Sequence, residues 1–125
     1  DMAIVREEIF GPVLTAFVYK DSEYDQVMSL IENTTPFALT GAIFCRDEKV
    51  LGRSCEMLRQ SCGNLYINDK STGAVVNQQP FGGARASGTN DKAGSYLNLL
   101  RWVSARTIKE TFVSPTDYRY PFMEE

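Results

Sequence analysis

Apolar and polar positions along the chain fall into blocks whose period changes from strand-like to helical and back. Residues 12–19 (PVLTAFVY) are apolar and rich in β-formers, which predicts a strand. Residues 22–34 then place apolar side chains at helical spacing. Asp21 and Ser22 are the candidate N-caps of this helix, with Asp25 completing a capping pair with Ser22, and Pro36 is expected to end it.

The same alternation continues through the middle of the chain. Residues 38–45 (ALTGAIFC) predict a second strand, Asp47 should cap a second helix, and Gly63 is expected at the C-terminal end of that helix. Residues 64–68 (NLYIN) predict a third strand. The βαβαβ order indicates an α/β fold, with a parallel sheet, helices on both faces and right-handed crossovers.

A long segment without an obvious period follows the third strand, over residues 69–91 (DKSTGAVVNQQPFGGARASGTND). Ligands of parallel sheets collect beyond the C-terminal ends of the strands, so a shaped binding loop is expected here. Residues 96–102 should form a last helix. Residues 107–113 (TIKETFV) predict one more strand, and because no partner is evident within the chain, a neighbouring subunit could pair with it.

Composition narrows the classes of protein. The chain has 125 residues and a net charge of -3, which gives no reason to expect nucleic-acid binding. No apolar run approaches the ~18 residues of a membrane span. Three cysteines without a CxxC pair argue against a disulfide scaffold or zinc ribbon and favour a reducing compartment. The absence of histidine excludes Cys-His and Ser-His nucleophile pairs within this chain, and imidazole metal sites.

Three segments carry a resemblance to a known family. Residues 7–13 (EEIFGPV), 63–69 (GNLYIND) and 80–88 (PFGGARASG) resemble, in the same order, three segments of the aldehyde dehydrogenase superfamily. Residues 68–91, with STGA, QQPFGG and ARASGTND, resemble the anchor loop of the Δ1-pyrroline-5-carboxylate dehydrogenases, also called glutamate-γ-semialdehyde dehydrogenases. The chain therefore looks like the C-terminal part of such an enzyme, with Asp1 at a cut.

The resemblance implies an activity and a setting. The parent enzyme would oxidise L-glutamate γ-semialdehyde, formed from Δ1-pyrroline-5-carboxylate, to L-glutamate in proline catabolism. NAD is the expected cofactor, with NADP as the alternative. The expected partners are the semialdehyde, the rest of the parent chain and further copies in a homodimer or higher homo-oligomer, with neither nucleic acid nor membrane. The bacterial cytoplasm and the mitochondrial matrix are both compatible.

The resemblance also assigns roles to five residues. Glu8 matches the carboxylate that accepts hydrogen bonds from the nicotinamide ribose, and Phe10 the aromatic residue near the nicotinamide. Gly73 and Ala74 match anchor-loop residues whose backbone N–H groups hold the distal carboxylate of the substrate. Ala74 stands where relatives can have serine, so a hydroxyl donor is absent here. Phe81 matches the aromatic residue that packs on the aliphatic part of the substrate.

Each role has a plainer alternative. Without the resemblance, Glu8 reads as a surface carboxylate, Phe10 and Phe81 as core aromatics, and Gly73 as a turn residue. For Gly82 and Gly83 the turn role is favoured, with contact to a ligand as the open alternative. Lys70 and Arg85 could attract a carboxylate, although solvated loop charges are the favoured interpretation.

The chain departs from the family pattern in its chemistry. The family nucleophile is a cysteine upstream of EEIFGPV, and the context of Cys45, Cys55 and Cys62 differs, so all three are expected to be structural. No catalytic residue and no metal ligand is therefore assigned, and the chain alone is expected to be inactive. Residues 1–103 are expected to belong to the catalytic domain, and residues 104–125 to form an oligomerisation strand and tail. The alternatives are an aldehyde dehydrogenase with another substrate, or a non-catalytic assembly module.

Overall fold

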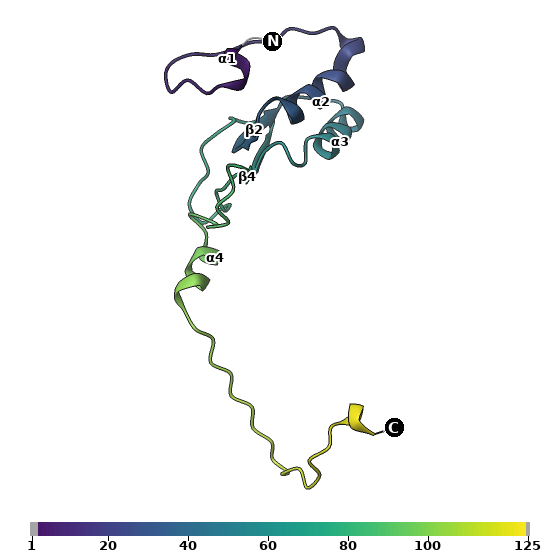
Figure 1. The fold of residues 1–125 in the computed structure, drawn as a ribbon, viewed down its shortest axis with the longest axis vertical. Helices are drawn as coiled ribbons and strands as arrows, with labels where there is room; N and C mark the ends of the chain where they lie inside the picture. Colours follow the sequence, from purple (N-terminus) through teal and green to yellow (C-terminus); the bar gives the residue numbers. More distant parts are fainter. Residues whose placement is uncertain (1–2, 125) are drawn as a thin grey trace.

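The computed structural model describes residues 3–124; Asp1, where a cut is expected, lies outside them. The elements are α1 (Ala3–Arg6), the 3-10 turn η1 (Asp21–Glu23), α2 (Tyr24–Thr34), β1 (Phe37–Ala38), β2 (Thr40–Ile43), α3 (Glu48–Met57), β3 (Asn64–Ile67), β4 (Ala84–Arg85), α4 (Tyr96–Leu99), and the 3-10 turns η2 (Leu100–Trp102) and η3 (Pro121–Met123). The helices α2 and α3 gather around the strands, and the chain beyond α4 leaves this body as a long arm (Figure 1).

The central part of the fold is the parallel pair β2–β3. The strands run in register from Thr40 opposite Asn64 to Ile43 opposite Ile67, and α3 forms the crossover between them. This βαβ unit confirms the predicted parallel arrangement and the α/β class. The short strands β1 and β4 form a separate antiparallel pair, with Phe37 opposite Arg85. That second pair ties the long loop back to the segment in front of β2.

The helices α2 and α3 lie side by side. Val27 and Met28 of α2 pack with Leu58, at the end of α3, in the buried cluster of the molecule. The Tyr24 hydroxyl lies 2.5 Å from Oγ of the fully buried Ser54, which links the two helices directly. Helices on opposite faces of a sheet could not touch in this way. The expectation that these helices cover both faces is therefore wrong.

Helix α3 begins where the sequence predicts. The Asp47 carboxylate accepts hydrogen bonds from the backbone N–H groups of Lys49 and Val50, at 2.9 and 3.0 Å, and so satisfies two of the free donors of the first turn. The helix ends with Leu58 as its C-cap. The prediction of Gly63 as the cap is wrong, because Gly63 lies beyond the helix and donates its N–H toward the carbonyl oxygens of residues 38 and 39.

Helix α2 starts differently from the prediction. The Lys20 N–H donates to the Glu23 carboxylate at 3.0 Å, and the turn η1 leads into the helix. The expected capping pair of Ser22 and Asp25 is therefore wrong. Asp25 instead forms an exposed ion pair with Arg53 of α3 at 2.5 Å.

Two expected strands do not form within residues 3–124. Residues 12–19 and 107–113 lie outside every strand, so the strand predicted at 12–19 is wrong for this chain. The strand predicted at 107–113 depends on pairing with a neighbouring subunit and stays a prediction. The apolar side chains of both ranges are exposed, with Leu14 and Phe112 both 93% accessible. A strand requires a neighbour for its backbone hydrogen bonds, and no described segment supplies one to either range. None of the described helices is long and apolar enough to cross a membrane.

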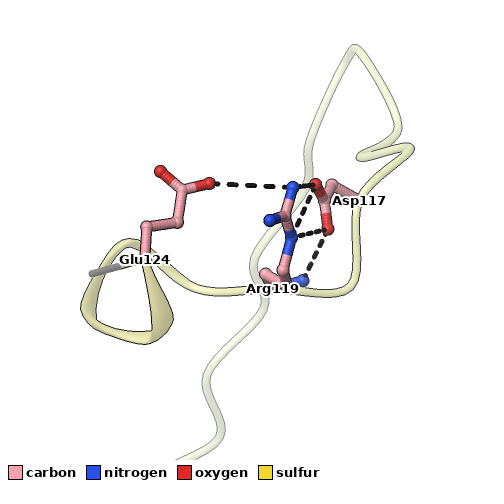
Figure 2. A network of polar contacts seen from close by, with 3 residues as sticks. All are labelled: Asp117, Arg119 and Glu124. Atoms are coloured by element: carbon pink, nitrogen blue, oxygen red, sulfur yellow. Dashed lines mark hydrogen bonds and ion pairs between the residues drawn. The ribbon is translucent and has the colours of Figure 1, made fainter.

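The end of the arm has a local polar network around Arg119 (Figure 2). Its guanidinium donates to both carboxylate oxygens of Asp117 and lies 4.0 Å from a Glu124 oxygen. These hydrogen bonds hold the pKa of the Asp117 carboxyl below its ordinary value. The rings of Tyr120 and Phe122 stack with centroids 5.8 Å apart. The network shapes the last turn, and its hydrogen bonds and ion pairs join only Asp117, Arg119 and Glu124.

Candidate functional site

The loop after β3 is held in shape by bonds between its own two limbs. The Phe81 N–H donates to the Ala93 carbonyl at 2.9 Å, and the Asn77 N–H donates to the Gly94 carbonyl at 2.6 Å. Arg101 of η2 forms an ion pair with Asp91, so the helical segment that follows is attached to the same loop. The loop is therefore a defined structure, as the sequence predicts, although it contains only the two-residue strand β4.

The loop lines an open pocket of about 340 Å³, a volume in the usual range of small-molecule sites. The three predicted substrate-binding residues, Gly73, Ala74 and Phe81, all line it. The other residues of the wall are Thr72, Val75, Val76, Gln79, Ala93 and Gly94. The structure thus brings together the three predicted residues, which the sequence separates by up to eight positions.

The chemistry of this pocket suits an anion attached to an apolar stem. No charged side chain is among its lining residues, whereas Val75, Val76 and Phe81 supply apolar surface. Within residues 3–124, the backbone N–H groups of Gly73 and Ala74 donate to no acceptor. Gly73 has φ +103°, a conformation that favours glycine and lets the backbone turn at this wall. Neutral backbone donors of this kind can hold an anion without a counter-charge.

The two predicted cofactor-binding residues lie apart from this pocket. Glu8 lines a second hollow of about 530 Å³, formed between residues 4–8, the end of α2 and the β1–β2 region. Phe10 is 94% exposed and lines neither of the two hollows. The two hollows share no lining residue. The described chain therefore does not bring the cofactor candidates and the substrate candidates into one site.

Comparison with known proteins identifies the family. The family described as "Aldehyde dehydrogenase family" matches residues 1–108. The chain belongs to the aldehyde dehydrogenase family. It is 59% identical over 119 residues to the mitochondrial Delta-1-pyrroline-5-carboxylate dehydrogenase of Dictyostelium discoideum, covering 95% of this chain and 21% of the relative. It is 57% identical over 121 residues to the enzyme of that name from Bos taurus, covering 97% and 22%.

Solved structures agree with the sequence relatives. The Delta-pyrroline-5-carboxylate dehydrogenase from Mycobacterium tuberculosis bound with NAD matches with a TM-score of 0.76 and 56% identity, over 93% of this chain and 22% of that chain. A 1-pyrroline-5-carboxylate dehydrogenase from Thermus with bound NAD matches with a TM-score of 0.62 and 42% identity, over 76% and 17%. This aldehyde dehydrogenase chain thus spans about a fifth of the length of the relatives it matches.

The three cysteines of this aldehyde dehydrogenase chain are free thiols, and their structural role stays a prediction. All three are half-buried and free of disulfides. Burial and then the neighbouring Cys55 raise the pKa of the Cys62 thiol, which disfavours the reactive thiolate. The Cys45 thiol donates to the Asp47 carbonyl at 3.4 Å. Among the described residues, no group of three or more histidine, cysteine, aspartate or glutamate side chains could hold a metal ion.

Arg85 has a structural role. Its guanidinium donates to the backbone carbonyls of Glu32 and Phe37, at 2.5 and 3.2 Å, and so binds the C-terminal end of α2. A cation is favoured there because the last carbonyls of a helix carry partial negative charge. Arg85 is exposed, as the sequence analysis favours, and these bonds add a structural role that it did not predict. Lys70 is exposed and lines neither hollow.

Some residues around the pocket had no role in shaping it assigned from the sequence. Gln79 lines the pocket next to Phe81, and Asn64 of β3 bonds the backbone on both sides of that phenylalanine. Gly63 and Gly83 lie in close backbone contact: a Cβ on Gly63 would overlap the Gly82 oxygen and lie 2.6 Å from the Gly83 Cα. The motif segments GNLYIND and QQPFGG contain these residues, but resemblance alone did not distinguish their functions.

Proposed function

We propose that this chain supplies the substrate-anchoring part of an NAD-dependent dehydrogenase that oxidises L-glutamate γ-semialdehyde, derived from Δ1-pyrroline-5-carboxylate, to L-glutamate. The observation that carries the proposal is the pocket lined jointly by Gly73, Ala74 and Phe81, with free backbone donors beside apolar walls. Identities of 57 to 59% to relatives named Delta-1-pyrroline-5-carboxylate dehydrogenase support the same substrate.

The pocket would act by orientation. The N–H groups of Gly73 and Ala74 donate to the distal carboxylate of the substrate, and the Phe81 ring packs on its methylene groups. With both contacts made, the aldehyde carbon has few remaining orientations relative to the catalytic groups. Such positioning raises the reaction rate, because the reacting atoms are already aligned when the substrate is bound and little orientational entropy remains to be lost in the chemical step.

Glu8 and Phe10 fit a contribution to NAD binding. A carboxylate can accept hydrogen bonds from both ribose hydroxyls, and Glu8 stands at a hollow of suitable size. Phe10, with 94% of its surface accessible, has a ring free to pack against a planar group. When bound, NAD supplies the hydride acceptor. NAD is preferred over NADP here because the Mycobacterium and Thermus structures hold NAD.

The nucleophile and the general base are expected outside these 125 residues, because burial raises the pKa of the Cys62 thiol and the Cys45 thiol donates to a backbone carbonyl. On this proposal the chain alone is inactive. Residues 1–103 form part of the catalytic domain, and residues 104–125 pair with another copy of the enzyme in a homo-oligomer. The compartment is the mitochondrial matrix or the bacterial cytoplasm; the Dictyostelium and Bos relatives are named mitochondrial.

The test is Phe81→Ala in the complete enzyme, with NADH formation measured on glutamate semialdehyde and on propanal. We expect kcat/KM on glutamate semialdehyde to fall by about 10- to 100-fold, through lost packing, while propanal is oxidised almost as before. Equal kcat/KM values for the variant and the wild type on glutamate semialdehyde would refute the role of Phe81. A wild-type enzyme that prefers propanal would leave the family assignment intact and refute the substrate.

A gain-of-contact variant complements this test. Ala74→Ser adds a hydroxyl donor at the wall where the distal carboxylate would bind. One extra hydrogen bond to a charged group should lower KM for glutamate semialdehyde by about 5-fold, without affecting propanal. Gly52→Ala in α3 serves as the control, since nothing lies within 4 Å of the added Cβ and the site is remote from the pocket lining. An unchanged or higher KM in Ala74→Ser argues against a carboxylate at this wall.

A further inference from the structure

The side chain of Asn64 brackets the backbone around Phe81. Its Nδ2 donates to the Pro80 carbonyl at 3.0 Å, and its Oδ1 accepts from the Gly82 N–H at 3.0 Å. The two partners are the peptide groups immediately before and after Phe81. A carboxamide has one donor and one acceptor side on a rigid plane, so both bonds together fix the direction of this short stretch of backbone.

Phe81 itself has a third constraint. Its N–H donates to the Ala93 carbonyl at 2.9 Å, as part of an isolated antiparallel bridge. That bond joins two limbs of the same loop and would move with the loop. The Asn64 bonds differ because they connect the loop to the parallel sheet, where Asn64 pairs with Thr40 of β2. Asn64 therefore transfers the rigidity of β3 to the pocket wall.

We propose that Asn64 is a positioning residue for the substrate pocket, acting through Phe81 to set selectivity for semialdehydes that carry a distal carboxylate. The proposal rests on the proposed function of the pocket. Its physical basis is that Phe81 is a lining residue, and the direction of its ring follows from the backbone that Asn64 holds. Small misplacements of a positioning group are known to lower rates strongly.

Asn64→Asp in the complete enzyme is the first variant. Aspartate has the same shape and still accepts from the Gly82 N–H, but it no longer donates to the Pro80 carbonyl. We expect kcat/KM for glutamate semialdehyde to fall by about 10-fold, mainly through KM, with propanal oxidation unchanged within about twofold. Asn33→Ala is the matched control, because the Asn33 amide also donates to a backbone carbonyl, at 2.7 Å, but on α2 away from the pocket.

The double variant Asn64→Asp/Phe81→Ala separates positioning from general support of the fold. If Asn64 acts through Phe81, the second substitution adds almost nothing to the loss caused by Phe81→Ala alone, whereas independent roles would multiply. Multiplied losses, or equal losses on both substrates together with a lower melting temperature, would overturn the proposal. If Asn64→Asp does not fold, Asn64→Ser, which keeps a donor and an acceptor on one hydroxyl, undergoes the same comparison.

The two proposals fail in different ways. A wild-type enzyme without preference for glutamate semialdehyde refutes the proposed substrate. A wild-type enzyme that has the preference and an Asn64→Asp variant that keeps it unchanged refute the positioning role alone. Selective loss in Asn64→Asp, non-additive with Phe81→Ala and absent from Asn33→Ala, is the expected result.

Discussion

Residues 69–95 and residues 103–124 have equally little regular secondary structure but differ in how they are fixed. The first segment is attached to the sheet through Asn64 and to β1 through β4, and its two limbs bond each other. The second leaves the body as an arm with apolar side chains exposed along its length, among them Ile108 at 77% (Figure 1). Within the described residues, the ion pairs of the arm are confined to its own end.

The difference shows that regular secondary structure and fixed structure are separate properties. The first segment is fixed without a long series of hydrogen bonds between strands, because side-chain amides and a few backbone hydrogen bonds satisfy its polar groups. The arm has β-forming residues but no neighbour to pair with among the described residues. Strand propensity therefore identifies a segment able to pair, while the position of the partner decides whether it does.

The largest effect should come from filling the contact between β3 and the first segment. Gly63→Ala places a methyl group against the Gly82 oxygen and 2.6 Å from the Gly83 Cα, both backbone atoms. The loop must shift, and we expect a loss of stability of about 3 kcal/mol, read as a lower melting temperature. Gly52→Ala is the control: its Cβ would meet nothing within 4 Å, and alanine favours the helix by about 0.5–1 kcal/mol. Equal melting temperatures for both variants would contradict the contact.

A smaller loss is expected when the bond between the loop and β1 is removed. The Ala38 N–H, in a residue only 3% exposed, donates to the Ser87 Oγ at 3.0 Å. Ser87→Ala leaves that buried donor unpaired, at a cost of about 2 kcal/mol in the free energy of unfolding. Ser104→Ala in the arm removes a hydroxyl that makes no hydrogen bond within residues 3–124, and urea denaturation should detect no change for it. Similar urea denaturation midpoints for the two variants would show that the Ser87 hydrogen bond does not stabilise the loop.

Proteolysis measures the same contrast within this chain. Trypsin should cut after Arg106 and Lys109 in the arm at least about 10-fold faster than after Arg85 and Lys92 in the loop, because cleavage requires local opening. Mass spectrometry of timed digests gives the order. Faster cleavage of the loop would invert the comparison. Protection of the arm that disappears on dilution would instead show that a second copy covers it.

The smallest effect concerns the end of the arm. The pKa of Asp117 is lowered by its bonds to Arg119, so this interaction is fully present above the ordinary value of 3.8 and is lost as pH falls through the lowered one. Carboxyl-carbon NMR shifts of Asp117 should therefore titrate below pH 3.8. In Arg119→Gln the titration should return toward that value. An identical titration in both proteins would exclude the network of Figure 2 in solution.

The parts of the fold that the sequence predicts are those formed by local patterns. The two long helices, the Asp47 cap and the parallel pairing of β2 with β3 follow from periodicity and chain order. The β1–β4 pair escaped prediction because each strand has two residues, too few to show a period, and Phe37 and Arg85 lie 48 positions apart. Residues 12–19 have a high strand propensity, but no described segment lies beside them to form the backbone hydrogen bonds of a strand.

The candidate site divides in the same way. Gly73, Ala74 and Phe81 were found through family motifs, and the structure places them around one pocket, although their roles stay predictions. Asn64 was missed because its bonds span 16 and 18 positions, and a sequence pattern carries no geometry over that distance. The Gly-Asn pair that opens β3 was the available clue, since a residue without a side chain beside a carboxamide permits close approach of another backbone.

The two hydrogen bonds of Asn64 on either side of Phe81 also have a consequence for engineering. The loop is attached to β3 through residues 63, 64 and 80–83. Residues 72–76 form a separate stretch of the pocket wall. Residues 72–76 can therefore be exchanged while the residues that attach the loop to β3 are kept. Variant libraries confined to residues 72–76 should change the chain length and terminal group of the aldehydes that the enzyme accepts. The attachment of the loop to β3 should keep its geometry.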